Sequence, residues 1–124
     1  MILEPHIAGT TVVALDGEFD LTQRTRLDDA FAAALGSSLI VLDLERTRYF
    51  DSTVLSCLVQ LQTTVHDHGG QLILVNAPDA MLRLLESCGL LALLDVRDSM
   101  RDVETERTAR GGGMRRIELI AGAH

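Results

Sequence analysis

Two short, continuous apolar runs limit what this chain can fold into more than any other feature of its sequence. Residues 39–42 read Leu-Ile-Val-Leu, and residues 71–75 read Gln-Leu-Ile-Leu-Val, which is apolar after its first residue. A strand that faces solvent on one side alternates apolar and polar residues, whereas a strand that is buried on both faces is apolar throughout. We therefore predict that both runs are buried strands of a sheet packed by helices.

In the segments before, between and after these runs, apolar residues recur every three or four positions, which is the period of an amphipathic helix. Asp20 or Thr22 is suited to cap the first helix and Ser52 the second, because their side-chain oxygens accept hydrogen bonds from free backbone N–H groups at a helix start. Pro78 is suited to the first position of the third helix. Glycines follow each stretch, where a helix is expected to end. The predicted helices extend through residue 35, over about 53–68 and over 78–89.

The beginning of the chain predicts a pair of strands. Residues 2–8 are a weak strand interrupted by a proline, and residues 10–15 are a stronger strand rich in β-branched residues. Gly9 lies between them and indicates a hairpin turn. We expect residues 16–20 to end the second strand, and residues 43–51 to form a loop.

The end of the chain is less strongly patterned. Residues 91–96 predict a last short strand, a short charged helix follows from residue 98, and the glycines at 111–113 form a flexible joint. We assign residues 1–110 to one domain and residues 111–124 to a flexible C-terminal tail, either frayed or packed on a partner. The alternation of strands and helices predicts an α/β fold, with a mixed sheet of four or five strands packed by three or four helices.

Composition excludes several classes of partner. The chain has 18 acidic and 11 basic residues, and its net charge is −7. An acidic surface repels phosphate backbones, and Trp is absent, so we expect no direct binding of nucleic acid. No apolar run approaches the roughly 20 residues of a membrane span. The start of the chain does not resemble a signal peptide, so we expect a cytoplasmic protein without membrane insertion.

The residues that most often carry catalysis or metals are poorly spaced for either. Cys57 and Cys88 lie among apolar residues and lack the spacing of a zinc site, so we expect both in the core. His66 and His68 point about 200° apart on one helix and cannot share a metal. Ser52 and His66 lie about 21 Å apart along the helix axis, which excludes a nucleophile–base pair. We therefore expect no metal, no cofactor and no enzymatic activity.

Residues 49–55 combine two hydroxyls and a carboxylate at a helix start, just after a buried strand. In open α/β sheets, sites form at the edge where the strands end. A helix N-terminus also favours a negative charge, so the fold would tolerate a phosphate on Ser52. On spacing alone, the simpler interpretation of Ser52 is a helix cap.

Four stretches, taken in order and with their spacing, resemble the STAS domain family, which includes bacterial anti-sigma factor antagonists. The pattern is an apolar strand that ends in Asp-Leu, a short loop, and an Asp-Ser-Thr sequence that opens a helix. The resemblance covers about residues 9–97. The stretches are Gly17-Glu18-Phe19-Asp20, residues 39–56, residues 69–76 and residues 84–90.

The resemblance implies a switch. In the family, the serine after the aspartate is phosphorylated by a cognate anti-sigma factor that is itself a serine kinase, and the matching residue here is Ser52. The unphosphorylated protein binds the anti-sigma factor and frees a sigma factor, which regulates transcription in responses such as stress; phosphorylation ends the binding. Thr53 is a secondary acceptor. The implied partner-binding residues are Asp20, Asp51, Ser52, Thr53, Val54 and Ser56.

Two positions differ from the family pattern, because Val54 and Ser56 stand where the family has glycines. Glycine allows a close approach of backbones, and Val54 adds bulk beside the acceptor. This difference and the unmatched tail favour an alternative, in which the chain is a STAS subunit that is not phosphorylated. It would then belong to a transport ATPase complex or a stress-signalling scaffold.

Overall fold

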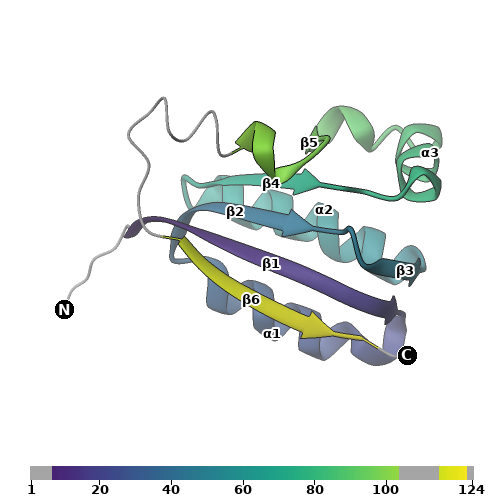
Figure 1. Cartoon of the computed structure of the whole chain (residues 1–124), viewed down its shortest axis with the longest axis horizontal. Helices are drawn as coiled ribbons and strands as arrows, with labels where there is room; N and C mark the ends of the chain where they lie inside the picture. Colours follow the sequence, from purple (N-terminus) through teal and green to yellow (C-terminus); the bar gives the residue numbers. More distant parts are fainter. Residues whose placement is uncertain (1–6, 104–114, 123–124) are drawn as a thin grey trace.

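One parallel sheet organises the molecule (Figure 1). The computed structural model describes residues 7–103 and 115–122. The strand order is β3-β1-β2-β4-β5, with β6 paired to β1, and every described strand pair is parallel. The strands are β1 (Ile7–Phe19), β2 (Ser37–Asp43), β3 (Thr47–Phe50), β4 (Gln71–Val75), β5 (Asp95–Arg97) and β6 (Arg115–Ala121).

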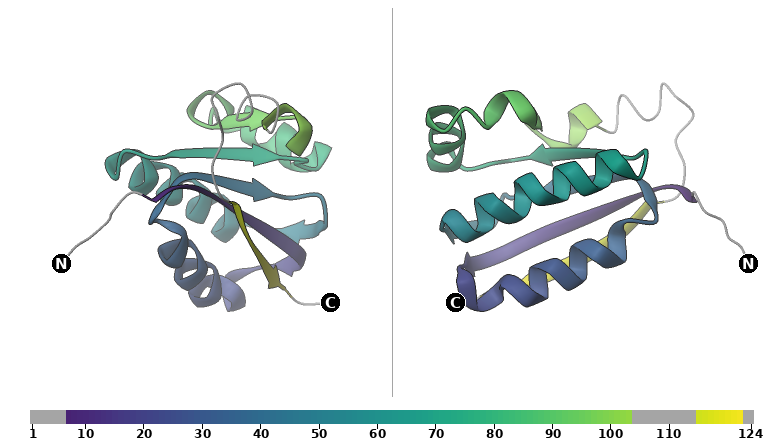
Figure 2. Two further views of the ribbon diagram at one scale, coloured as in Figure 1. Left: turned by 60° about the vertical axis from the view of Figure 1, so that its left-hand side comes forward. Right: turned by 180° about the vertical axis from the view of Figure 1, so that it is seen from behind.

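Two helices cover one face of this sheet. Helices α1 (Arg24–Ala34) and α2 (Ser52–Asp67) lie side by side behind the strands, as the two views of Figure 2 show. Helix α3 (Asp79–Ser87) lies beyond the end of β4 (Figure 1). Two 3-10 turns are also present, η1 (Leu21–Gln23) and η2 (Leu91–Leu93). None of the described helices is long and apolar enough to cross a membrane.

Both apolar runs form strands that are buried on both faces, as predicted. Leu42 of β2 and Leu74 of β4 are register partners, and both are fully buried in the core beneath the helices. Val41 and Ile73 point to the opposite face, where they pack with Val103 and with other apolar residues. The predicted helices are also present, with ends within a few residues of those expected.

The predicted hairpin at the N-terminus is wrong. Strand β1 runs without a turn from Ile7 through Gly9 to Phe19, and it pairs in parallel with β2. Gly17 has a φ of +115°, which glycine adopts without a side-chain clash, so the strand continues where a break was expected. The sheet is consequently parallel with six strands, instead of mixed with four or five. Residues 2–6 of the predicted first strand lie outside the described residues.

Two further elements differ from the sequence prediction. The expected loop over residues 43–51 contains β3, a short strand that pairs with the end of β1. The expected strand over residues 91–96 is instead η2 followed by β5. Both strands are only three or four residues long, too short for periodicity to distinguish from a loop.

The C-terminal strand lies within the segment that was assigned to a tail. Residues 115–121 form β6 and pair with Thr10–Asp16 of β1. Ile120 is buried in the main core, whereas Leu119 is 65% exposed. This pairing differs from the flexible tail that was expected. The glycines at 111–113 and residues 104–109 of the predicted charged helix lie outside the described residues, and residues 100–103 are helical.

Candidate functional site

The ends of β1 and β3 align two aspartates at one edge of the sheet. Phe19 and Phe50 are register partners in a parallel pair. The next residue in each strand is an aspartate, Asp20 in one and Asp51 in the other, and each caps the helix that follows. Neighbouring strands lie about 4.8 Å apart, so the pairing brings the starts of η1 and α2 to the same edge.

Asp51, rather than Ser52, is the N-cap of α2. The Asp51 Oδ1 atom accepts hydrogen bonds from the backbone N–H groups of Thr53 at 2.9 Å and of Val54 at 3.4 Å. Ser52 is the first helical residue and is exposed. Its hydroxyl has no hydrogen bond within the described part of the chain. The predicted capping role of Ser52 is therefore wrong, and its hydroxyl is not needed to cap the helix. It lies at a helix end that favours negative charge.

Asp20 is held by its own capping box. Its Oδ1 atom accepts hydrogen bonds from the backbone N–H of Thr22 at 2.8 Å and from the Thr22 hydroxyl at 2.6 Å. Gln23 reciprocates, because its Oε1 atom accepts the backbone N–H of Asp20 at 2.7 Å. The two bonds from Thr22, with the hydroxyl contributing most, hold the pKa of Asp20 below its ordinary value of 3.8. Asp20 thus presents a fixed, ionised carboxylate at this edge.

Replacing Thr22 by Val is expected to raise the pKa of Asp20 toward 3.8, because the stronger of the two hydrogen bonds is lost. A carboxyl whose pKa is lowered by folding adds stability above its unfolded pKa, and this contribution disappears as the pH falls through the folded pKa. In Thr22→Val, the free energy of unfolding should therefore decrease less than in the wild type as the pH falls below about 4. An NMR titration of the Asp20 carboxyl measures the shift. Thr25→Val, at an exposed site on α1, is the control, and an unchanged Asp20 pKa in Thr22→Val would contradict the assignment.

The other predicted site residues divide between the surface and the core. Ser56 is exposed, one helical turn after Ser52, and Thr53 is half-buried. Val54 is only 1% exposed and packs in the main core. Its side chain points into the domain, so it is not available for direct contact with a partner, contrary to what the family resemblance implies. Its bulk does not obstruct the surface around Ser52.

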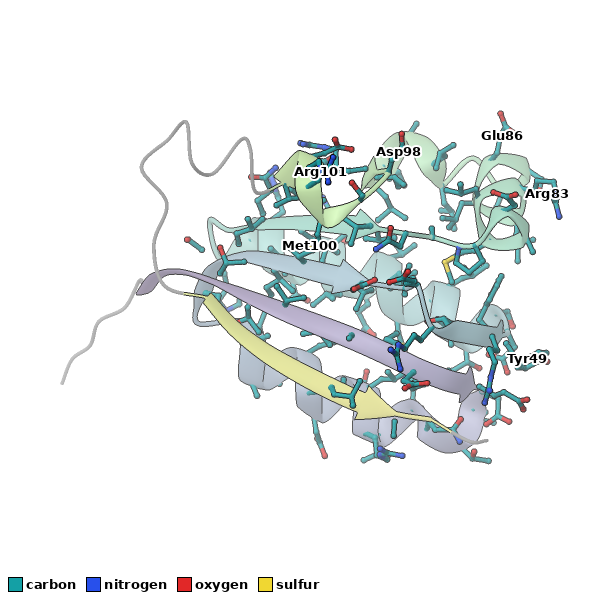
Figure 3. The ribbon with its side chains drawn as sticks, in the orientation of Figure 1. Tyr49, Arg83, Glu86, Asp98, Met100 and Arg101 are labelled. Atoms are coloured by element: carbon teal, nitrogen blue, oxygen red, sulfur yellow. The ribbon has the colours of Figure 1, made fainter. Side chains whose placement is uncertain are left out.

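Apolar side chains that the sequence analysis did not single out flank this edge. Leu21 is 68% exposed and directly follows Asp20, and Tyr49 is 50% exposed and lies two residues before Asp51. Figure 3 shows Tyr49 at the end of β3, projecting away from the sheet. In the sequence, the available signal is an apolar residue close to each capping aspartate. The fold is needed to show that Leu21 and Tyr49 are exposed and lie at the same edge. The edge thus combines acidic groups with exposed apolar side chains.

The two cysteines lie in different environments. Cys57 is buried, and burial is the main cause that raises its pKa, so the thiol stays protonated. It lies beside a cavity of about 320 Å³ between α1 and α2, where Arg24 donates hydrogen bonds to Asp28 and Gln60. Cys88 is exposed, so its predicted place in the core is wrong. Among the described residues, no group of three or more metal-ligating side chains is close enough to hold an ion.

Comparisons with known proteins agree with this architecture. A family model described as "Mlab, STAS domain" matches residues 5–95. The anti-sigma factor antagonist SpoIIAA in its unphosphorylated form is 19% identical, with a TM-score of 0.65, over 87% of this chain and 96% of that chain. The Bacillus cell fate determinant SpoIIAA in its phosphorylated form is 20% identical, with a TM-score of 0.65, over 86% and 98% of the two chains.

A transporter domain shares the same fold. The STAS domain of a SulP transporter from Vibrio cholerae is 18% identical, with a TM-score of 0.63, over 81% of this chain and 84% of that chain. No curated protein sequence matches. Identities at this level show the fold alone, whereas the family model covers most of the chain and carries the assignment. This chain belongs to the STAS domain family.

Proposed function

We propose that this chain is an anti-sigma factor antagonist. It binds an anti-sigma factor that is a serine kinase, thereby frees a sigma factor, and is switched off when the kinase phosphorylates Ser52. In this role the chain is the substrate of an enzyme and not itself an enzyme, and the partner binds the ATP. It acts in the cytoplasm and affects promoters through protein partners, which is consistent with its net charge of −7.

The observation that carries the proposal is the position of Ser52. Its hydroxyl is exposed at the first residue of α2, and Asp51 already caps the helix, so phosphorylation removes no hydrogen bond on which the fold depends. The helix N-terminus stabilises the added negative charge. Because the fold tolerates the phosphate, modification would change binding without unfolding the domain.

The chemistry of the surrounding edge supports a protein partner. Asp20 and Asp51 provide carboxylates, and Leu21 and Tyr49 provide exposed apolar surface. A partner that is complementary to this edge carries basic groups around an apolar patch. A phosphate on Ser52 adds almost two negative charges next to Asp51, and those charges lose their solvation when the interface forms.

The alternative is a STAS subunit of a transport assembly, in which Ser52 is only a surface residue. One observation favours it: one of the similar structures is the STAS domain of a SulP transporter. The bulk of Val54 no longer favours it, because Val54 is buried. The unmatched tail is weaker support as well, because part of it pairs with β1 of the same chain.

Phosphoryl transfer tests the proposal directly. The purified chain is incubated with ATP and the serine-kinase anti-sigma factor encoded nearest to its gene, and intact mass and peptide mapping then locate any phosphate. We expect a single phosphate on Ser52 in the wild type and in Thr53→Val, and none in Ser52→Ala. Thr53→Val is a suitable control because it removes the neighbouring hydroxyl and keeps Ser52. A phosphate on Thr53 alone would remove Ser52 as the acceptor, and no phosphate on any residue would favour the transport-subunit alternative.

A further inference from the structure

Strand β6 pairs with the edge of β1 that faces away from β2. It lies beyond residues 5–95, the part of the chain that the family model matches. Seven register pairs join it to β1, from Thr10 with Arg115 to Asp16 with Ala121. Ile120, the partner of Leu15, is 7% exposed and belongs to the main core. The strand is therefore an integral part of the folded domain.

The end of β6 fits against β1 only because residue 122 is a glycine. A Cβ atom on Gly122 would overlap the Glu18 carbonyl oxygen and would lie 2.9 Å from two ring carbons of Phe19. A real Cβ atom does not come that close to a backbone atom, and the Glu18 carbonyl cannot rotate away as a flexible side chain can. A side chain at this position must displace either the end of β6 or the end of β1.

One peptide group connects β6 with the start of β3. The Asp16 carbonyl accepts a hydrogen bond from the Gly122 N–H at 2.7 Å, and the Gly17 N–H donates to the Arg46 carbonyl at 2.9 Å. The Asp16 carbonyl and the Gly17 N–H belong to the same planar peptide unit, so rotating that unit to follow one partner misaligns the other bond. The Asp16 carboxylate also lies 3.8 Å from the Arg46 guanidinium.

From this linkage we infer that β6 is a positioning strand for the edge that carries Ser52. Docking of Gly122 fixes the Asp16–Gly17 peptide and the Phe19 ring. Phe19 is fully buried and pairs with Phe50, and the next residues are the two capping aspartates. Displacement of β6 therefore loosens the β1–β3 ladder and changes the relative position of Asp20 and Asp51. Only the consequence for partner binding rests on the proposed function.

Hydrogen exchange of the full-length chain tests the linkage. Gly122→Ala should increase the exchange rate of the Gly17 amide, measured by NMR, at least tenfold. Gly36→Ala is the control for the substitution itself, because a Cβ atom there meets nothing within 4 Å. Leu119→Ser is the control within β6, because Leu119 is exposed. Both controls should exchange as the wild type does.

A second variant keeps the inference testable if Gly122→Ala does not fold. Ile120→Ala weakens the docking of β6 by removing core contacts, without the clash at residue 122, and should also accelerate exchange at Gly17. Exchange at Gly17 that equals the wild type while the amides of β6 exchange faster would overturn the inference. This readout needs no kinase, so a failure of phosphoryl transfer at Ser52 and a failure of the β6 linkage are separate results.

Discussion

Replacing Leu42 by Asp is expected to abolish the folded state. Leu42 and its register partner Leu74 are both fully buried, in the two strands at the centre of the core. Leu42 packs within the apolar core cluster, so the new carboxylate is buried among apolar side chains. Such burial costs several kcal/mol, which is comparable with a total stability of about 5–15 kcal/mol. Thermal unfolding followed by circular dichroism should show no cooperative transition.

The matched control makes the same chemical change at an exposed strand position. Leu119 lies in β6 and is 65% exposed, so Leu119→Asp introduces a carboxylate that stays in water. Substitutions at such surface sites usually change stability by no more than about 0.5 kcal/mol. A Leu42→Asp variant that unfolds cooperatively near the wild-type temperature would mean that β2 is not buried as described.

The central strands were predictable because each encodes its environment locally. The continuous runs at 39–42 and 71–75 are apolar at every central position, which is the pattern of a strand covered on both faces. The N-terminal hairpin failed for the converse reason. Gly9 indicates a turn when it is considered alone, but pairing along the whole of β2 extends β1 through it, and local propensity carries no information about that pairing.

In the candidate site too, local features were predictable and long-range contacts were not. Asp20, Asp51 and Ser52 were recognisable because helix caps and the family pattern are local features. Their meeting at one edge depends on the register of Phe19 with Phe50, and the contact of Gly122 with Phe19 joins residues about a hundred positions apart. Burial of Val54 follows from the helical period, because Val54, Leu58, Leu61 and Val65 share one apolar face of α2, whereas its place among the partner-binding residues came only from the family pattern.

Replacing Ser52 by Glu is expected to leave the fold intact and to reduce affinity for the anti-sigma factor about a hundredfold or more. A glutamate in the first turn of α2 is favoured by the helix dipole, so the unfolding temperature should not fall. At the interface, the added charge lies beside Asp51 and must lose its water, and a cost of about 2.7 kcal/mol corresponds to that loss of affinity. Titration calorimetry with the purified anti-sigma factor measures it, and Ser52→Ala should bind as the wild type does.

A charge control distinguishes a local switch from a general increase in negative charge. Thr63 is exposed on the same helix, 11 residues or about 16 Å further along its axis, so Thr63→Glu adds the same charge outside the edge that carries Ser52. Charges separated by more than a Debye length, about 8 Å at physiological salt, interact weakly, so this variant should keep most of its affinity. Equal affinities of the wild type and Ser52→Glu would remove Ser52 as the switch. Equal losses in Ser52→Glu and Thr63→Glu would instead show that the partner senses only net charge, because Thr63 lies outside the edge that carries Ser52 and Asp51.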